Sequence, residues 1–406
     1  MKVVIINSDS FFLNKTADMV SDSVDVTLIQ NYTPSKNMVK FLTIFDSVFK
    51  TRFRRLQIRR CKSSNVVVHG LLKNDILKAV CHFAAKLGFS MDKLNAYVAK
   101  EFGAIAARYL DDAEILHLRT GYGQGGTIEM AKRKNMKVIA DHSIACTEEI
   151  ADILTPEYKK HGISNGIGPQ SSFWKLVIDD CRRADVILVN SDYVKKTFVK
   201  HGYNPDKIVV NYLGVRDDWF SIKKSYGFSK DYMQILFVGE FGIRKGVEYL
   251  LKASQLLNTR GIRYRIVVIG KPADIDDYIK EFDISHFDFV GTVLYDELKK
   301  YYSQCDAYLF PSLCEGSTRA GMEAMAAGMP VIFTDNCGCP VEDEVNGLIV
   351  PIKDEKAIAD AVEKLYNSEE LRERLGKNAA MTIANKYTWK HYRDNLLALY
   401  NSLVQI

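Results

Sequence analysis

The stretch Pro311-Ser-Leu-Cys-Glu-Gly-Ser-Thr-Arg-Ala-Gly-Met-Glu-Ala-Met-Ala-Ala-Gly-Met-Pro-Val-Ile332 decides the fold. Residues 306–310 before it and 331–334 at its end have the apolar composition of short buried strands. Residues 317–327 between them favour a helix, which Gly328 and Pro330 would stop. A strand, a helix and a strand in this order predict a βαβ unit, and hence a parallel sheet.

Two carboxylates lie in this unit, Glu315 in the loop before the predicted helix and Glu323 about two turns into it. At 1.5 Å per residue they are roughly 12 Å apart. That separation suits a ligand with hydroxyl groups at both ends and an anionic middle over the helix N-terminus. The alternative is a capping Glu315 and a solvated Glu323. Because the residues around Glu323 are apolar, and an unpaired buried carboxylate is costly, the pattern favours ligand binding.

The stretch resembles the Glu-x7-Glu signature of the family-4 retaining glycosyltransferases. The resemblance implies an α/β protein of the GT-B fold, with two Rossmann-like domains facing each other across a cleft. Residues 1–215, together with a crossover helix in 387–406, would form the acceptor-binding domain. Residues 216–386 would form the nucleotide-sugar-binding domain, and the C-terminal helix would cross back onto the first domain.

The donor site follows from the same resemblance. Glu315 would support the catalytic end of the site, and Glu323 would bind ribose hydroxyls. Arg244 and Lys245 follow a glycine-containing loop at the start of a predicted helix, where positive potential suits a diphosphate. The other predicted donor contacts are Gly316, Ser317, Thr318, Arg319, Gly239, Gly291, Thr292 and Val293.

The acceptor site is predicted at the carboxyl ends of two strands in the first domain. The strand at 137–143 ends in Asp141 and His142, and the resemblance assigns His142 a catalytic position with Asp141 beside it. The strand at 114–119 ends near a turn with four glycines between 121 and 126, which permits close backbone approach to a ligand, although loop flexibility alone is an alternative. The predicted acceptor contacts are His117, Arg119, Gly121 and Asp141.

Composition is that of a soluble globular protein of about two domains. The chain has 406 residues, 47% of them hydrophobic and 26% charged, with a formal net charge of +5. It contains no apolar run near the roughly 20 residues of a membrane span, and its N-terminus leads directly into a strand, so we expect a cytoplasmic protein. Of eight cysteines only Cys337 and Cys339 are closely spaced, so we expect reduced thiols, no metal site and no cofactor.

Residues 50–62 carry seven basic residues and no acid. A solvated helix face is one interpretation, and peripheral contact with an anionic membrane or a charged acceptor is another. Nucleic acid is disfavoured because Phe53 is the only aromatic residue in the run, which leaves no stacking platform.

We therefore predict a metal-independent, retaining glycosyltransferase that moves a sugar from a nucleotide-sugar donor to a hydroxyl of a glycan or lipid-linked acceptor, in polysaccharide or glycolipid assembly. A sugar-nucleotide epimerase or hydrolase on the same fold is an alternative. An inactive GT-B module that binds a glycan or a partner is another, because Glu240, Thr318 and Cys339 depart from the family pattern.

Overall fold

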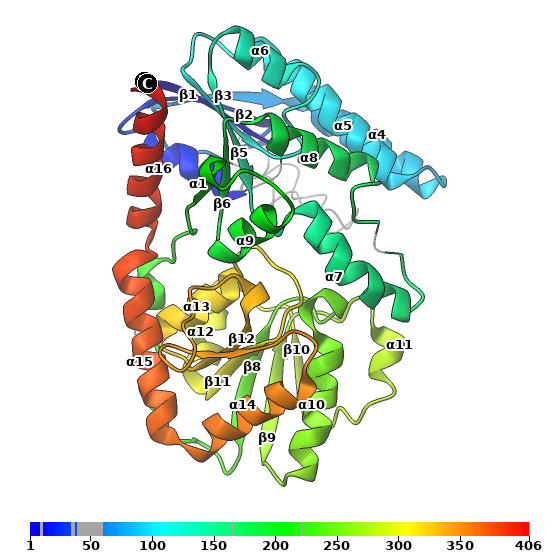
Figure 1. Cartoon of the computed structure of the whole chain (residues 1–406), viewed down its shortest axis with the longest axis vertical. Coiled ribbons are helices and arrows are strands. Elements are labelled where there is room, and N and C mark those ends of the chain that lie inside the picture. The colour runs from blue at the N-terminus through cyan, green and yellow to red at the C-terminus, as the bar shows by residue number, and fades with distance from the viewer. Residues whose placement is uncertain (9–10, 34–36, 39–59, 165, 221, 406) are drawn as a thin grey trace.

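The computed structural model describes residues 1–406 apart from 9–10, 34–36, 39–59, 165, 221 and 406. Two α/β domains follow one another along the chain, each built around a parallel sheet (Figure 1). Within the described residues the first sheet has seven strands in the order β3-β2-β1-β4-β5-β6-β7, and the second has six in the order β10-β9-β8-β11-β12-β13.

The first domain has strands that are almost entirely buried near its centre, as expected of a parallel sheet covered on both faces. Its strands are β1 (Lys2–Asn7), β2 (Asp25–Asn31), β3 (Val66–Leu71), β4 (Ile115–Arg119), β5 (Lys137–His142), β6 (Val186–Val189) and β7 (Ile208–Val210). Its helices are α1 (Phe11–Val20), α4 (Leu72–Lys86), α5 (Met91–Ala106), α6 (Thr127–Arg133), α7 (Thr147–Lys160), α8 (Ser172–Arg183) and α9 (Asp192–Lys200).

The second domain contains the predicted βαβ unit. Its strands are β8 (Met233–Val238), β9 (Tyr264–Ile269), β10 (Phe287–Gly291), β11 (Ala307–Phe310), β12 (Val331–Thr334) and β13 (Leu348–Val350). Its helices are α10 (Val247–Thr259), α11 (Asp276–Ile279), α12 (Leu298–Gln304), α13 (Arg319–Ala327), α14 (Glu355–Asn367) and α15 (Glu369–Lys386).

The unit β11–α13–β12 confirms the prediction made from residues 306–334. Strands β11 and β12 are parallel, with Tyr308 opposite Val331. Helix α13 begins two residues later than predicted because Thr318 is its N-cap. It ends at Gly328, whose φ of 85° is a left-handed conformation that glycine adopts readily.

The last helix, α16 (Trp389–Val404), lies against the first domain, as the sequence predicted (Figure 1). The Tyr392 hydroxyl lies 2.9 Å from Thr16 Oγ1 on α1, and the Tyr400 hydroxyl lies 2.6 Å from His117 Nδ1 on β4. Buried hydrogen bonds at two points along α16 therefore hold it against α1 and β4 of the first domain.

Some elements differ from the sequence prediction. Helix α7 carries Pro156 in its interior, and the sequence pattern did not reveal this helix. No helix among the described residues is long and apolar enough to cross a membrane. All eight cysteines are free thiols, as predicted.

Candidate active site

Glu315 meets two cations of the second domain. Lys245 and Arg244 both donate to the same carboxylate oxygen, Arg244 Nη1 at 2.7 Å, and the Ser312 hydroxyl donates to it at 3.0 Å. The Glu315 side chain is only 12% exposed. Burial alone would raise the pKa of Glu315, but Lys245 and Arg244 hold it below its ordinary value. Three of the four predicted catalytic residues, Glu315, Arg244 and Lys245, thus form one ion cluster around a buried carboxylate, and the fourth, His142, lies outside it.

The loop that carries Glu315 also contacts the first domain. The backbone N–H of Ala145 donates to the Glu315 carbonyl at 3.1 Å, and the Ser191 hydroxyl donates to the Gly316 carbonyl at 2.5 Å. A Cβ on Gly316 would lie 2.0 Å from the carbonyl oxygen of Ser143. Glycine is therefore required where the two domains touch.

His142 is the last residue of β5, just before Ser143 and Ala145, which meet the Glu315 loop, and it is 2% exposed. Its Nε2 lies 3.2 Å from the Ala145 carbonyl and its Nδ1 lies 3.0 Å from the Thr120 hydroxyl. Since a carbonyl only accepts, Nε2 carries the proton and Nδ1 accepts from Thr120. Burial, with a smaller contribution from Arg119, lowers the pKa of His142 to about 4. The imidazole is therefore neutral near pH 7.

Glu323, on α13, is buried and bound by two side chains. The Tyr295 hydroxyl donates to its Oε1 at 2.6 Å and Arg319 Nε donates to the same oxygen at 2.9 Å. Trp219 Nε1 in turn donates to the Tyr295 hydroxyl at 2.7 Å. Burial raises the pKa of Glu323, against the opposing effects of Arg319 and Tyr295. Sequence reasoning identified Glu323 and Arg319 but not Tyr295 or Trp219.

Comparison with known proteins shows which proteins this chain is similar to. Residues 219–382, most of the second domain, match the family described as Glycosyl transferases group 1. The structure resembles sucrose-phosphate synthase from Thermosynechococcus elongatus, with a TM-score of 0.70 and 16% identity over 100% of this chain and 99% of that one. It also resembles Anabaena HepE in complex with UDP and glucose, with a TM-score of 0.64 and 14% identity over 99% of this chain and 100% of that one.

The chain has the GT-B fold. The family match lies in the second domain and covers less than half of the chain, so it shows that this domain is similar to the glycosyl transferases group 1. An uncharacterised glycosyltransferase of Methanocaldococcus jannaschii is 29% identical over 226 residues, which are 54% of this chain and 57% of that protein. The capsular polysaccharide biosynthesis glycosyltransferase CapM of Staphylococcus aureus is 26% identical over 239 residues, 54% of this chain and 62% of CapM. The chain therefore matches less than two thirds of the length of either relative.

The remaining predicted donor residues lie at a strand end or on loops of the second domain. Gly239 and Gly291 have φ of 152° and 81°, so both need glycine, and the Gly291 carbonyl accepts from the backbone of Gly270. Thr292 is exposed and Val293 is partly buried in the turn that leads to Tyr295. At the start of α13 two further predicted contacts, Ser317 and Thr318, are partly buried and buried.

The predicted acceptor residues separate into two groups. Arg119 and His142 line a pocket of about 300 Å³ together with Trp174, and Arg119 Nη1 donates to Asp141 Oδ1 at 3.1 Å. His117 does not belong to this pocket. It is completely buried, with Tyr400 on one ring nitrogen and Asp141 3.4 Å from the other. The structure therefore corrects the assignment of His117: it anchors α16 and has no exposed surface for an acceptor.

The glycine-rich turn folds around a carboxylate that the sequence did not single out. Asp180 Oδ2 accepts from the backbone N–H of Gly121 at 2.7 Å and of Gly123 at 2.9 Å, and its Oδ1 accepts from Gln124 Nε2 at 2.6 Å. Burial raises the pKa of Asp180 to about 7. The glycines thus allow the Asp180 side chain to approach the backbone, and the N–H of Gly121 donates to Asp180.

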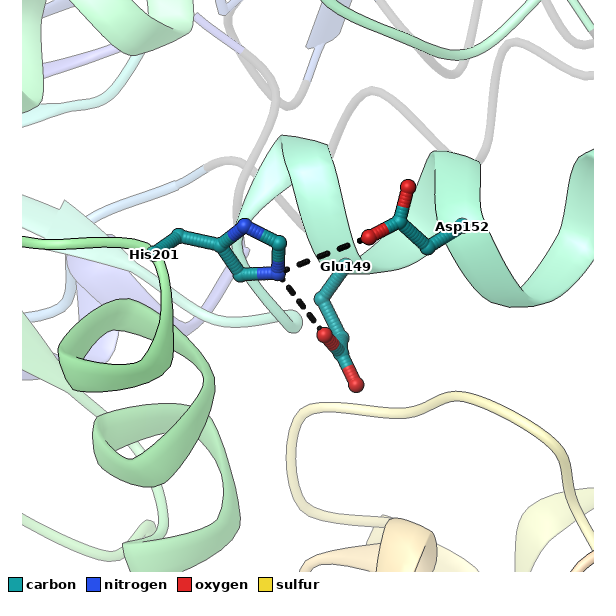
Figure 2. Close-up of side chains that lie close together, drawn as sticks. All are labelled: Glu149, Asp152 and His201. Carbon is teal, nitrogen blue, oxygen red and sulfur yellow. Dashed lines mark hydrogen bonds and ion pairs between the residues drawn. The ribbon is translucent and has the colours of Figure 1, made fainter.

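One cluster among the described residues has the spacing of a cation site: Glu149, Asp152 and His201 (Figure 2). His201 Nε2 lies 2.8 Å from Glu149 Oε2 and 3.8 Å from Asp152, and Lys200 donates to the same Glu149 oxygen at 2.6 Å. Although burial opposes it, Lys200 and His201 lower the pKa of Glu149. Ion pairing within the protein accounts for this cluster.

Proposed function

We propose that this chain is a retaining glycosyltransferase that moves a sugar from a nucleotide-sugar donor to a hydroxyl of a glycan or lipid-linked acceptor, in polysaccharide or glycolipid assembly. The observation that carries the proposal is the buried cluster of Glu315, Arg244 and Lys245 at the contact between the domains. It gathers two cations next to the loop that enters α13, where a diphosphate would be stabilised.

In this proposal the two cations take the place of a metal ion at the departing diphosphate. The hydrogen bonds of Arg244 to the Cys314 carbonyl and to Glu315 both leave from Nη1. A guanidinium has five N–H donors, so Arg244 can bind phosphate oxygens while it still holds Glu315. Glu315 would face the sugar, and Glu323 would accept from ribose hydroxyls once Arg319, whose side chain is 69% exposed, turns outward.

The chemistry needs no strong side-chain nucleophile. The acceptor oxygen would attack the anomeric carbon on the face from which the phosphate leaves, and a phosphate oxygen would take the hydroxyl proton. A neutral His142 can orient a hydroxyl but is a poor proton acceptor, since its pKa is about 4. Its role would be to position the acceptor or a hydroxyl of the donor sugar.

The first test is thermal stabilisation by a panel of UDP-, GDP-, ADP- and CMP-sugars. One donor should stabilise the wild type by about 2.7 kcal/mol at a hundred times its dissociation constant. Glu323→Ala and Lys245→Ala should lose that stabilisation, while Lys377→Ala, on the exposed side of α15, should keep it. Stabilisation by no donor would contradict the proposal and favour the inactive binding module.

A second measurement separates the transferase from the alternative enzymes. An epimerase or hydrolase consumes the nucleotide-sugar without any acceptor, whereas a transferase needs one. Donor turnover should therefore depend on added acceptor, and the product should keep the anomeric configuration of the donor. Contact of residues 50–62 with an anionic membrane stays a prediction, because residues 39–59 lie outside the described part of the chain.

A further inference from the structure

Helix α4 presents an apolar stripe to solvent. The stripe consists of Leu72, Ile76, Val80 and Phe83 on α4 and of Leu87, its C-cap, with exposed fractions of 51, 57, 57, 63 and 66%. Their spacing of four, four, three and four residues places them on one side of the helix. The two buried residues of α4, Asn74 and Cys81, lie on the opposite side. The more apolar side of this helix therefore faces away from the protein.

Single exposed apolar side chains are ordinary, but a contiguous set of this size marks an interaction surface. The turn after α4 extends the set with Phe89, which is 63% exposed. In Figure 1, α4 and the neighbouring α5 lie at the outer end of the first domain, away from α16 and the second domain. Neither the donor site nor the domain contact uses this surface.

The charges around the stripe are mainly positive. Lys73 and Lys86 are exposed on α4 itself. The nearby acids are engaged or partly buried. Asp75 accepts from the backbone of Tyr32 at 2.7 Å, Asp92 from the backbone of Ser172 at 2.6 Å, and Glu101 is partly buried.

We propose that α4 lies on the surface of a bilayer that contains anionic lipids. The stripe would enter the boundary between headgroups and acyl chains, and the lysines beside it would reach the negative headgroups. A second copy of the chain fits less well. An antiparallel pair of α4 helices around a two-fold axis would bring Lys73 of one copy close to Lys86 of the other, and like charges oppose that contact.

The side of α4 that faces the protein borders a pocket. It lines a pocket of about 470 Å³ through Asp75, Lys78 and His82, and Tyr122 and Phe173 complete the wall. Tyr122 and Phe173 also line the pocket beside His142. A bilayer under the stripe would lie one helix width, about 10 Å, from this groove, so a lipid-linked acceptor that stays anchored in the membrane would have to extend its head group past α4 to reach His142. This last step rests on the proposed function, whereas membrane contact itself does not.

The test is co-sedimentation of the whole chain with phosphatidylcholine vesicles, prepared with and without phosphatidylglycerol. The wild type should bind the anionic vesicles, and added salt should weaken the binding. The double variant Ile76→Ser with Phe83→Ser should lower the apparent affinity at least about tenfold, because two large apolar contacts are lost. Met381→Ser, an equally exposed position on α15, should bind like the wild type.

Charge is tested separately by Lys73→Glu with Lys86→Glu, which should weaken binding to anionic vesicles only. Unchanged binding in the stripe variant would overturn the proposal. A dimer in light scattering that the stripe variant abolishes would assign the surface to a second copy instead. A loss of thermal stability in that variant, with no vesicle binding by the wild type, would mean that the chain itself covers the stripe. Vesicle binding is measured without donor, so its failure is distinguishable from failure of the transferase proposal.

Discussion

The Tyr295 hydroxyl donates to Glu323 over 2.6 Å, although the two residues come from a turn and a helix 28 positions apart in the sequence. The same hydroxyl accepts from Trp219. In Tyr295→Phe the buried indole N–H and the carboxylate both lose a partner, so we expect a loss of about 1–3 kcal/mol in the free energy of unfolding. Urea denaturation measures this loss.

The same variant should also raise the pKa of Glu323, because the hydrogen bond from Tyr295 is one of the effects that lower it. Donor affinity should then weaken more steeply as the pH falls. Tyr366→Phe, on α14, serves as the control. Equal stability and an equal pH dependence in Tyr295→Phe and the wild type would contradict the assignment.

Glu315→Gln should be the most destabilising of the site substitutions. It leaves the buried Lys245 and the partly buried Arg244 without a counter-charge, and removing one partner of a buried pair costs about 3–5 kcal/mol. The folded-state pKa of Glu315 is lowered, so its contribution is present above the unfolded pKa of about 4.3 and is lost as the pH falls through the folded value.

The difference in unfolding free energy between wild type and Glu315→Gln should therefore be largest near pH 7 and shrink in acid. Guanidinium denaturation at several pH values measures it. Glu373→Gln removes one partner of an exposed pair with Lys377 and should cost less than about 1 kcal/mol. A comparably small effect in Glu315→Gln would show that the cluster contributes nothing to stability.

The fold was predictable because its signals are local. The unit at residues 306–334 combines short apolar strands with a helix stop at Gly328, and the structure reproduces both. Helix α7 was missed because Pro156 and a charged C-terminal half obscure its periodicity. Its first turn carries Glu149, and its last turns reach the second domain, where Glu157 accepts from Tyr249 at 2.7 Å. Such long-range partners leave no local pattern.

Site residues that belong to a sequence motif could be predicted, whereas contacts that form only when the chain packs could not. Glu315 was identified separately from Arg244 and Lys245, and their contact appears only once the strands that precede them, β11 and β8, are neighbours. Gly121 was read as a ligand contact because glycines permit close approach, but the carboxylate that approaches is Asp180 from α8. His117 was assigned to the acceptor because it precedes a strand end, while its partner Tyr400 lies 283 residues further along.

Gly316→Ala should impair catalysis more than stability. The added Cβ would overlap the Ser143 carbonyl at 2.0 Å, so the two domains would have to separate at the point where the Glu315 loop meets the first domain. A displacement of about 1 Å can cost on the order of a hundredfold in rate, and we expect a loss of that size in kcat/KM. Gly227→Ala, whose added Cβ would come no closer than 3.3 Å to another atom, is the control, and near wild-type activity in Gly316→Ala would contradict a need for this contact.

Asp180 should make the stability of the first domain depend on pH. Burial raises its folded-state pKa to about 7, whereas an unfolded aspartate titrates near 3.9. The folded chain therefore holds a proton that the unfolded chain releases, so the contribution of Asp180 is full below about pH 4 and is lost as the pH rises to 7. The folded and unfolded pKa of Asp180 differ by about three, which corresponds to about 4 kcal/mol in the free energy of unfolding.

The variant Asp180→Asn keeps an oxygen for the backbone of Gly121 and Gly123 but does not ionise, so its unfolding free energy should fall less between pH 4 and 7. Denaturation at closely spaced pH values measures the slope, with the exposed Asp111→Asn as control. An identical slope in Asp180→Asn and wild type would show that Asp180 is ionised throughout, and that the glycine turn binds it as a carboxylate.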